Sequence, residues 1–136
     1  LVAVMDPQGI ADRKSDPARF GTWVENACLA HAWNAGQRVC YWREEPHEVD
    51  GVLEGSWGSW ALEVKTGSYQ ARDLGSLLEF VRRNPRFRPL VVCDPRGRGP
   101  AQRVGVSCMS WQEFLAGAPL TNTTGTGRPQ PGSDGT

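Results

Sequence analysis

The sequence predicts an α/β domain in which a mixed β-sheet is flanked by helices. Segments with strand patterns alternate with segments with helical patterns, in the order α-β-β-β-α-β-β-α. Elements interleaved in this way pack as helices on the faces of a sheet. The chain has 136 residues, which is room for one domain with one core. We place the folded domain at residues 1–116 and a tail at residues 117–136.

The first helix is predicted at residues 19–35. Asp16 or Thr22 supplies its cap, Gly36 supplies the stop, and the residues between are apolar or neutral nearly all round. The helix should therefore be largely buried. Its only acidic residue is Glu25, which has two interpretations. It points outward from the first turn, where the helix dipole favours an acid, or it projects into a polar site inside the domain.

Five later segments have the residue pattern of strands: residues 38–43, 47–54, 59–66, 89–93 and 103–108. The second and third form a hairpin around the turn at residues 55–58. Two segments have a helical pattern: residues 71–84, stopped by Pro85, and residues 110–116, where Ser110 and Glu113 form a capping box. Together these segments give an α-β-β-β-α-β core, extended by one more strand and helix.

The two ends of the chain differ from this pattern. The sequence starts without Met and within an apolar run, residues 1–5, which suggests a fragment of a longer protein. Residues 6–19 mix Pro, Gly and charge and are typical of a loop. From Gly117 onward the chain is rich in Gly, Pro, Thr and Ser with little to bury, so this tail is predicted to be disordered.

The cysteines and the hydropathy indicate a cytoplasmic protein without a membrane partner. Cys28, Cys40, Cys93 and Cys108 form no C-x-x-C pair and have no His at metal-ligand spacing. We expect free thiols in a reducing compartment, with Cys40, Cys93 and Cys108 as small buried hydrophobes. The sequence has no signal peptide and no apolar run near the roughly 20 residues of a membrane span.

The formal net charge is zero, so attraction to a nucleic acid would depend on how the charges are arranged. One third of the chain is rich in arginine: Arg82, Arg83, Arg86, Arg88, Arg96, Arg98 and Arg103. These residues form a solvated rim or a phosphate-facing patch. Of the 15 basic residues only Lys14 and Lys65 are lysines. Such sparing use suggests that a lysine is kept where a compact ammonium is needed.

The predicted hairpin gathers charge on one face, because alternate side chains of a strand share a face. If it closes symmetrically about its turn, Asp50 lies opposite Glu63 and Glu48 lies opposite Lys65. The reverse face then carries an apolar layer, composed of Val49, Leu53, Leu62 and Val64. A slip of one residue would scatter both groups.

Two interpretations fit the charged face. Carboxylates directly opposite each other destabilise a sheet, and a bound Mg²⁺ removes the conflict because this ion is held by one or two carboxylates with waters and phosphate oxygens. Lys65 then positions the attacking water or neutralises charge on the phosphate. The other interpretation is a surface ladder in which Lys65 bridges the acids.

Asp50, followed after twelve residues by Glu63-Val64-Lys65 and preceded by a helix with Glu25, resembles the PD-(D/E)XK nuclease superfamily. The similarity is closer to the domain of unknown function that follows the ATPase module in many prokaryotic AAA-type ATPases. Five stretches carry it: FGTWVEN (20–26), YWR (41–43), EVDGVLEG (48–55), ALEVKTG (61–67) and DLGSLLEFVRRNP (73–85). The resemblance covers roughly residues 1–116 and implies a restriction-endonuclease-like core.

The resemblance implies a site as well as a fold. Asp50 and Glu63 would hold Mg²⁺, or Mn²⁺ in its place, Lys65 would act on the water or the phosphate, and Glu25 would complete the metal or water shell. Two features depart from the related domains. Gly51 replaces a large apolar residue, which predicts looser packing under Asp50, and the loop between Arg43 and Glu48 is short.

The implied function is Mg²⁺-dependent hydrolysis of a nucleic acid, preferably DNA. The alternative is a catalytically silent module that binds DNA or regulates an ATPase. The chain has no G-x-x-x-x-G-K-[ST] motif of its own. An ATPase partner would therefore be an N-terminal module absent from this chain.

Overall fold

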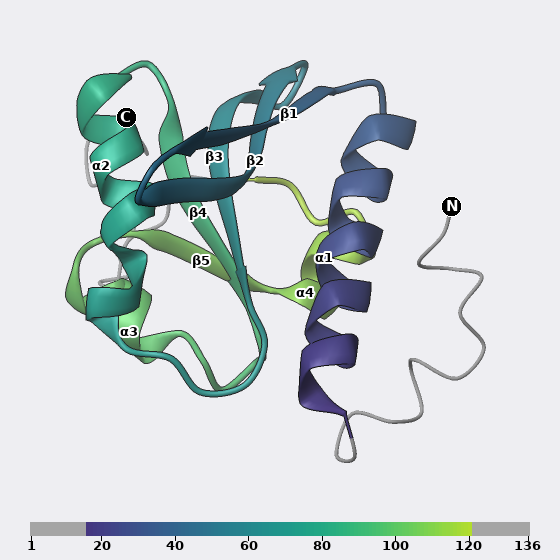
Figure 1. Ribbon diagram of the computed structural model, residues 1–136. Coiled ribbons are helices and arrows are strands. Elements are labelled where there is room, and N and C mark those ends of the chain that lie inside the picture. Colours follow the sequence, from purple (N-terminus) through teal and green to yellow (C-terminus); the bar gives the residue numbers. More distant parts are fainter. Residues whose placement is uncertain (1–15, 121–136) are drawn as a thin grey trace, which may run out of the picture.

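The computed structural model describes residues 16–120, which form a five-stranded mixed sheet with helices on both faces (Figure 1). The strands are β1 (Arg38–Glu44), β2 (His47–Gly55), β3 (Gly58–Lys65), β4 (Arg88–Cys93) and β5 (Ser107–Ser110), and their spatial order follows the sequence. The pairs β1–β2 and β2–β3 are antiparallel, whereas the pairs β3–β4 and β4–β5 are parallel. The predicted mixed α/β class is confirmed.

The first helix, α1 (Pro17–Asn34), starts and ends close to the predicted residues. Of the two candidate caps, Asp16 is the one used: its Oδ1 accepts the backbone N–H of Arg19 at 3.0 Å. The hydroxyl of Thr22 instead donates to the carbonyl oxygen of Ala18. After the helix, Gly36 adopts a φ of 91°, which glycine reaches without steric cost.

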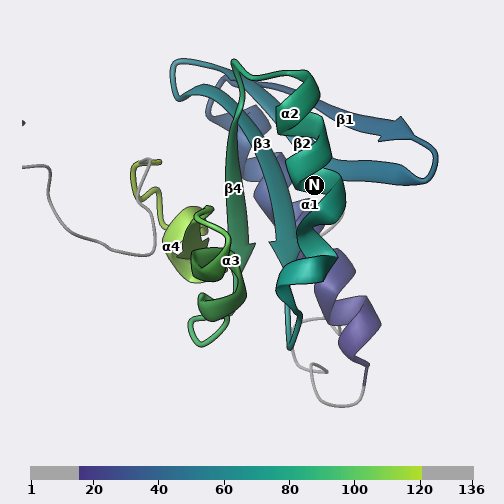
Figure 2. The ribbon, with the colours of Figure 1, turned by 90° about the vertical axis from the view of Figure 1, so that its left-hand side faces the viewer.

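The remaining helices are short. They comprise the 3₁₀ turn η2 (Ala71–Leu74), α2 (Gly75–Arg83), α3 (Gly99–Arg103) and α4 (Trp111–Leu115). The helices α1 and α4 lie on one face of the sheet, and α2 and α3 lie on the other (Figures 1 and 2). The capping box predicted for the last helix is present, because Ser110 and Glu113 exchange side-chain-to-backbone hydrogen bonds.

The strand β4 shows why the sheet is apolar on both faces. Its side chains alternate between the two layers: Leu90 and Val92 pack toward α1, while Val91 and Cys93 pack toward α2. A parallel strand buried on both faces is typically a continuous apolar run, as here.

The strand predicted at residues 103–108 is present but begins and ends later in the chain, as β5 (Ser107–Ser110). Residues Gly99–Arg103 form α3, and β5 begins only at Ser107. Pro100 lies in the first turn of α3, where its missing N–H removes no helical hydrogen bond. The Gly-Pro pair that indicates a turn therefore marks a helix start in this position.

A bulge between β1 and β2 corrects the predicted apolar layer. Cys40 pairs with Val52 but Trp42 pairs with Val49, so two steps along β1 span three along β2. Val49 is thereby placed in the layer facing α2, together with Val52 and not with Leu53 as predicted. The other members of the predicted layer, Leu62 and Val64, do face α1 with Leu53.

All four cysteines are free thiols, as predicted. Cys28 and Cys93 are buried and Cys108 is half-buried, but Cys40 is exposed on the edge strand β1, so its predicted burial is wrong. In the described sheet β1 pairs with β2 on one side, and no strand pairs with its other side. Over residues 16–120, no helix combines the length and the apolar character needed to span a membrane.

The packed part of the chain reaches Leu120, whose side chain contacts the apolar layer facing α1. The backbone N–H of Gly117 donates to the carbonyl oxygen of Phe114, and that of Ala118 donates to Glu113. Four residues assigned to the tail thus lie against the domain. The rest of the predicted tail, residues 121–136, and residues 1–15 lie outside the described residues.

Candidate active site at the fork between β2 and β3

The strands β2 and β3 pair in the predicted register and then separate. The pairs run from Gly55 opposite Gly58 to Gly51 opposite Leu62. Beyond that point β2 continues against β1, and β3 continues against β4 as far as Lys65 opposite Cys93. The candidate site lies in the fork between the two strands.

Asp50 stands where the strands part. Its Oδ2 accepts the backbone N–H of Val64 at 2.9 Å, so the carboxylate takes the place of a strand partner. The predicted pairing of Asp50 with Glu63 and of Glu48 with Lys65 is therefore wrong: the described pairs stop at Gly51 and Leu62. Glu48 instead pairs with Arg43 of β1, at 3.4 Å between Oε1 and Nε.

Glu63 and Lys65 lie two residues apart on β3 and so share a face. The Nζ atom of Lys65 is 3.4 Å from Oε2 of Glu63, and the side chains are 25% and 13% exposed, respectively. The second carboxylate oxygen of Glu63, Oε1, is buried and has no hydrogen-bond partner among residues 16–120. A buried polar atom without a partner is costly, which marks this oxygen as a place where a ligand atom would be stabilising.

Glu25 reaches toward the fork from α1. It is half-buried, and its pKa is raised to about 7 by burial first and by repulsion from Asp50 and Glu48 second. The other interpretation, an acid of the first turn that points outward, is wrong, because α1 begins at Pro17 and has no acidic residue in its first turn. The interpretation of Glu25 as facing a polar site is thus the one that agrees with the structure.

The carboxylates of Asp50 and Glu63 repel each other in a partly dry environment. Burial and the charge of Asp50 raise the pKa of Glu63 to about 8, although Lys65 acts in the opposite direction. Burial also raises the pKa of Asp50, against the lowering effect of the Val64 N–H and of Lys65.

The donor set fits a hard divalent cation of the Mg²⁺ type. Asp50 and Glu63 supply two carboxylates, one with an unpartnered oxygen, and Mg²⁺ typically takes one or two carboxylates and completes its shell with water and phosphate oxygens. No group of three or more His, Cys, Asp or Glu side chains is assembled as a metal site among residues 16–120. A cation here would therefore rely on water or substrate for the rest of its shell.

Gly51 is buried, and the predicted looser packing beneath Asp50 does not occur. A Cβ atom at Gly51 would lie 2.7 Å from Cδ2 of Leu29, so the side chain of Leu29 fills the space above this glycine. Leu29 and Glu25 are one turn apart on the same face of α1. Gly51 therefore allows β2 to approach α1 closely at a point one helical turn from Glu25.

The arginine-rich third of the chain is largely a rim of ion pairs. Arg83 bonds to Glu44 and Glu79, and Arg86 bonds to Glu54. Arg98 bonds to Glu113 at 3.0 Å. For these residues the solvated-rim interpretation holds, because their charge is already matched by neighbours.

Sequence reasoning missed the loops that follow β3 and β4. The backbone N–H of Gly67 donates to Oδ2 of Asp94 at 2.7 Å, which joins the two loops beside the fork. Oδ1 of the same carboxylate accepts the indole N–H of Trp111 at 3.1 Å. The available signal was Asp94 itself, a carboxylate placed directly after a buried strand.

The sequence profile of one protein family, a domain of unknown function (DUF4143), matches residues 20–114, more than half of the chain. The chain belongs to the DUF4143 family. The match to DUF4143 includes the fork, its four candidate residues and both loops. No curated protein and no solved structure matches the chain.

Proposed function

We propose that this DUF4143 domain is a Mg²⁺-dependent nuclease of the PD-(D/E)XK type, which hydrolyses phosphodiester bonds of nucleic acid, preferably DNA. The observation that carries the proposal is the fork. Asp50, Glu63 and Lys65 meet there with Glu25 from α1, and a buried oxygen of Glu63 has no partner.

Each residue has a distinct role in the proposal. Asp50 and Glu63 hold the cation, with Mn²⁺ as a second candidate, and the Val64 N–H fixes the Asp50 carboxylate in one orientation. Glu25 accepts a hydrogen bond from a water in the fork. When bound, Mg²⁺ supplies Lewis-acid stabilisation of the phosphate and lowers the pKa of a bound water.

Lys65 is the group that faces the reacting phosphate. Its ammonium lies 3.4 Å from Glu63 and is one-quarter exposed, so it is held by the site and remains accessible from solvent. There it stabilises negative charge that develops on the phosphate oxygens and orients the attacking water. A salt-bridge ladder on the surface would need neither the burial of Glu63 nor the contribution of Glu25.

We also propose that the domain acts as the C-terminal part of a larger ATPase, with the ATPase module as its partner. The support is the similarity of five ordered stretches to the domain found after AAA-type ATPase modules. A catalytically silent module that binds DNA or regulates that ATPase is the second candidate. The zero net charge and the ion-paired arginine rim favour it, because they leave little free positive surface for DNA.

The test is a titration of the chain with Mg²⁺ and with Mn²⁺, using labelled single- and double-stranded DNA. We expect metal-dependent cleavage by the wild type and a loss of at least about a hundredfold in Lys65→Met, since charge-stabilising groups contribute on that scale. Glu54→Gln is the matched control: it removes a carboxylate from the same hairpin, away from the fork, and should keep full activity.

Two results would decide against the nuclease. Cleavage that persists in Lys65→Met and Glu63→Gln would indicate a contaminating enzyme. DNA binding without any cleavage at millimolar metal would favour the silent module instead.

A further inference from the structure

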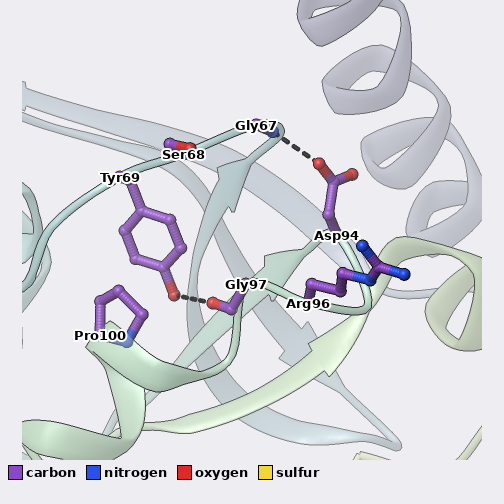
Figure 3. A pocket seen from close by; sticks show the side chains of 7 residues that line it. All are labelled: Gly67, Ser68, Tyr69, Asp94, Arg96, Gly97 and Pro100. Carbon is purple, nitrogen blue, oxygen red and sulfur yellow. Dashed lines mark hydrogen bonds between the residues drawn. The ribbon is translucent and has the colours of Figure 1, made fainter.

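A cavity of about 280 Å³ opens at the edge of the sheet where the parallel strands β3 and β4 end. One wall is the loop after β3, with Gly67, Ser68 and Tyr69, and the other is the loop after β4, with Arg96 and Gly97 (Figure 3). Ligands of α/β proteins are typically found outside the carboxyl ends of the strands. The cavity has that position, and Gly67 follows Lys65 by two residues.

Hydrogen bonds between the two loops hold the cavity open. The hydroxyl of Tyr69 donates to the carbonyl oxygen of Gly97 at 2.6 Å, and Asp94 accepts the N–H of Gly67 at 2.7 Å. A Cβ atom at Gly97 would lie 3.3 Å from the carbonyl oxygen of Asp94 and 3.5 Å from the ring of Tyr69, so the loops pass close to each other here. The walls are therefore preorganised.

The polar groups left available in the cavity are donors. Arg96 is exposed and forms no ion pair with any other residue in the range 16–120, whereas Arg98, two residues on, is bound to Glu113. Ser68 is also exposed, and its hydroxyl has no hydrogen-bond partner within that range. The carboxylate of Asp94, the acid in the lining, accepts bonds from Gly67 and Trp111. Arg96 and Ser68 thus contribute a guanidinium and a hydroxyl from opposite sides of the cavity (Figure 3), and groups of both kinds bind the oxygens of anions.

We propose that this cavity binds a phosphate group of the nucleic-acid strand, next to the phosphate that is attacked in the fork. Arg96 forms an ion pair with that phosphate, and Ser68, on the other side of the cavity, donates a hydrogen bond to the same strand. The inference rests on the proposed nuclease function and adds to it the group that places the strand. Because Gly67 follows Lys65, the last residue of β3, by only two residues, neighbouring phosphates of one strand reach the cavity and the fork together.

The experiment measures binding of a fluorescent single-stranded oligonucleotide by anisotropy over a range of salt concentrations. It is carried out in EDTA, and with Mg²⁺ in the Lys65→Met background so that no strand is cut. Arg96→Gln should weaken binding by about tenfold and lower the slope of log K against log salt by about one, the expected loss for one phosphate contact. Arg96→Lys, which keeps the charge, should retain most of the affinity.

Arg103→Gln is the matched control. Arg103 lies on α3, is exposed, forms no ion pair with another residue that the structure describes, and does not line the cavity. Both variants should keep the wild-type thermal midpoint. If they lose affinity equally, or if Arg96→Gln loses none, the cavity proposal is overturned and the nuclease proposal stands. If the wild type binds no oligonucleotide in either condition, both proposals are overturned.

Discussion

Two acidic clusters of this domain place the same kind of group in opposite surroundings. Glu79 of α2 is bonded by Arg82 and Arg83 at the surface, and these partners lower its pKa to about 2. Glu63 of β3 is buried beside Asp50 with Lys65 as its cation, and its pKa is raised to about 8. In the first cluster two arginines surround one carboxylate, whereas in the second Lys65 is the one cation that the described residues set against the carboxylates of Asp50 and Glu63.

The contrast separates a structural ion pair from a candidate site. A folded domain gains nothing from two buried carboxylates and one partnerless oxygen, since apolar residues of similar size would be more stable. Perturbed carboxylates of this kind concentrate at functional sites. The deficit of positive charge in the fork is the property that a bound cation would correct, and the following changes test it.

The largest expected effect is on stability with metal. A cation that binds only the native state raises the free energy of unfolding by about 2.7 kcal/mol at a hundredfold excess over its Kd. We expect Mg²⁺ to raise the thermal midpoint of the wild type, Glu63→Gln to remove most of this rise, and Glu79→Gln to keep it. Thermal melts of the three proteins with and without Mg²⁺ give the comparison. A wild-type midpoint indifferent to millimolar Mg²⁺ and Mn²⁺ would remove the basis of the proposed metal site.

The part of this contrast that the sequence could predict is local. The turn after Gly55 and the alternation of side chains in the hairpin are enough to set its register, and they place Glu63 and Lys65 on one face. The fork was not predictable from them. It depends on the bulge between β1 and β2, and on a side-chain bond from Asp50 to the Val64 backbone that stands where a strand pair was expected.

Long-range contacts account for the rest. The periodicity of the first helix leaves the direction of Glu25 open, because that depends on which sheet face α1 covers. In the structure, α1 covers the face on which the side chain of Leu29 lies against Gly51. The cavity at Arg96 likewise exists only because β3 and β4, which are separated by α2, end side by side. Neither arrangement leaves a signal in the spacing of residues along the chain.

The second expected effect is a pH dependence of opposite sign in the two clusters. The folded-state pKa of Glu63, about 8, exceeds its ordinary value of 4.5, so without metal the folded domain loses stability as pH rises between these values. Glu79, with a pKa of about 2, contributes stability above 4.5 that is lost as pH falls toward 2. Glu25, with a pKa of about 7, adds to the first trend.

Urea unfolding in EDTA at about pH 5 and about pH 8 measures this difference. We expect Glu63→Gln to be more stable than the wild type at the higher pH, by about 1–3 kcal/mol, and to show a flatter pH profile. Glu79→Gln should keep the wild-type slope over this range. A wild type whose stability increases toward pH 8 would show that the fork carries no excess negative charge.

The smallest expected effect concerns how α1 positions Glu25. Gly51→Ala inserts a Cβ atom 2.7 Å from Cδ2 of Leu29, the end of a flexible side chain that can move away. The entropic gain from replacing a strand glycine offsets part of this crowding, so we expect a change in stability of less than about 1 kcal/mol.

Leu29 and Glu25 lie one turn apart, and a shift of α1 would move Glu25 relative to Asp50. Metal-dependent cleavage should therefore fall several-fold although the fold is intact. Leu29→Ala removes the atoms with which the new Cβ clashes. In the Leu29→Ala background, Gly51→Ala should therefore lower the cleavage rate much less than it does in the wild type, and a double-mutant cycle measures this difference. If the two substitutions are additive, the contact between α1 and β2 does not set the position of Glu25.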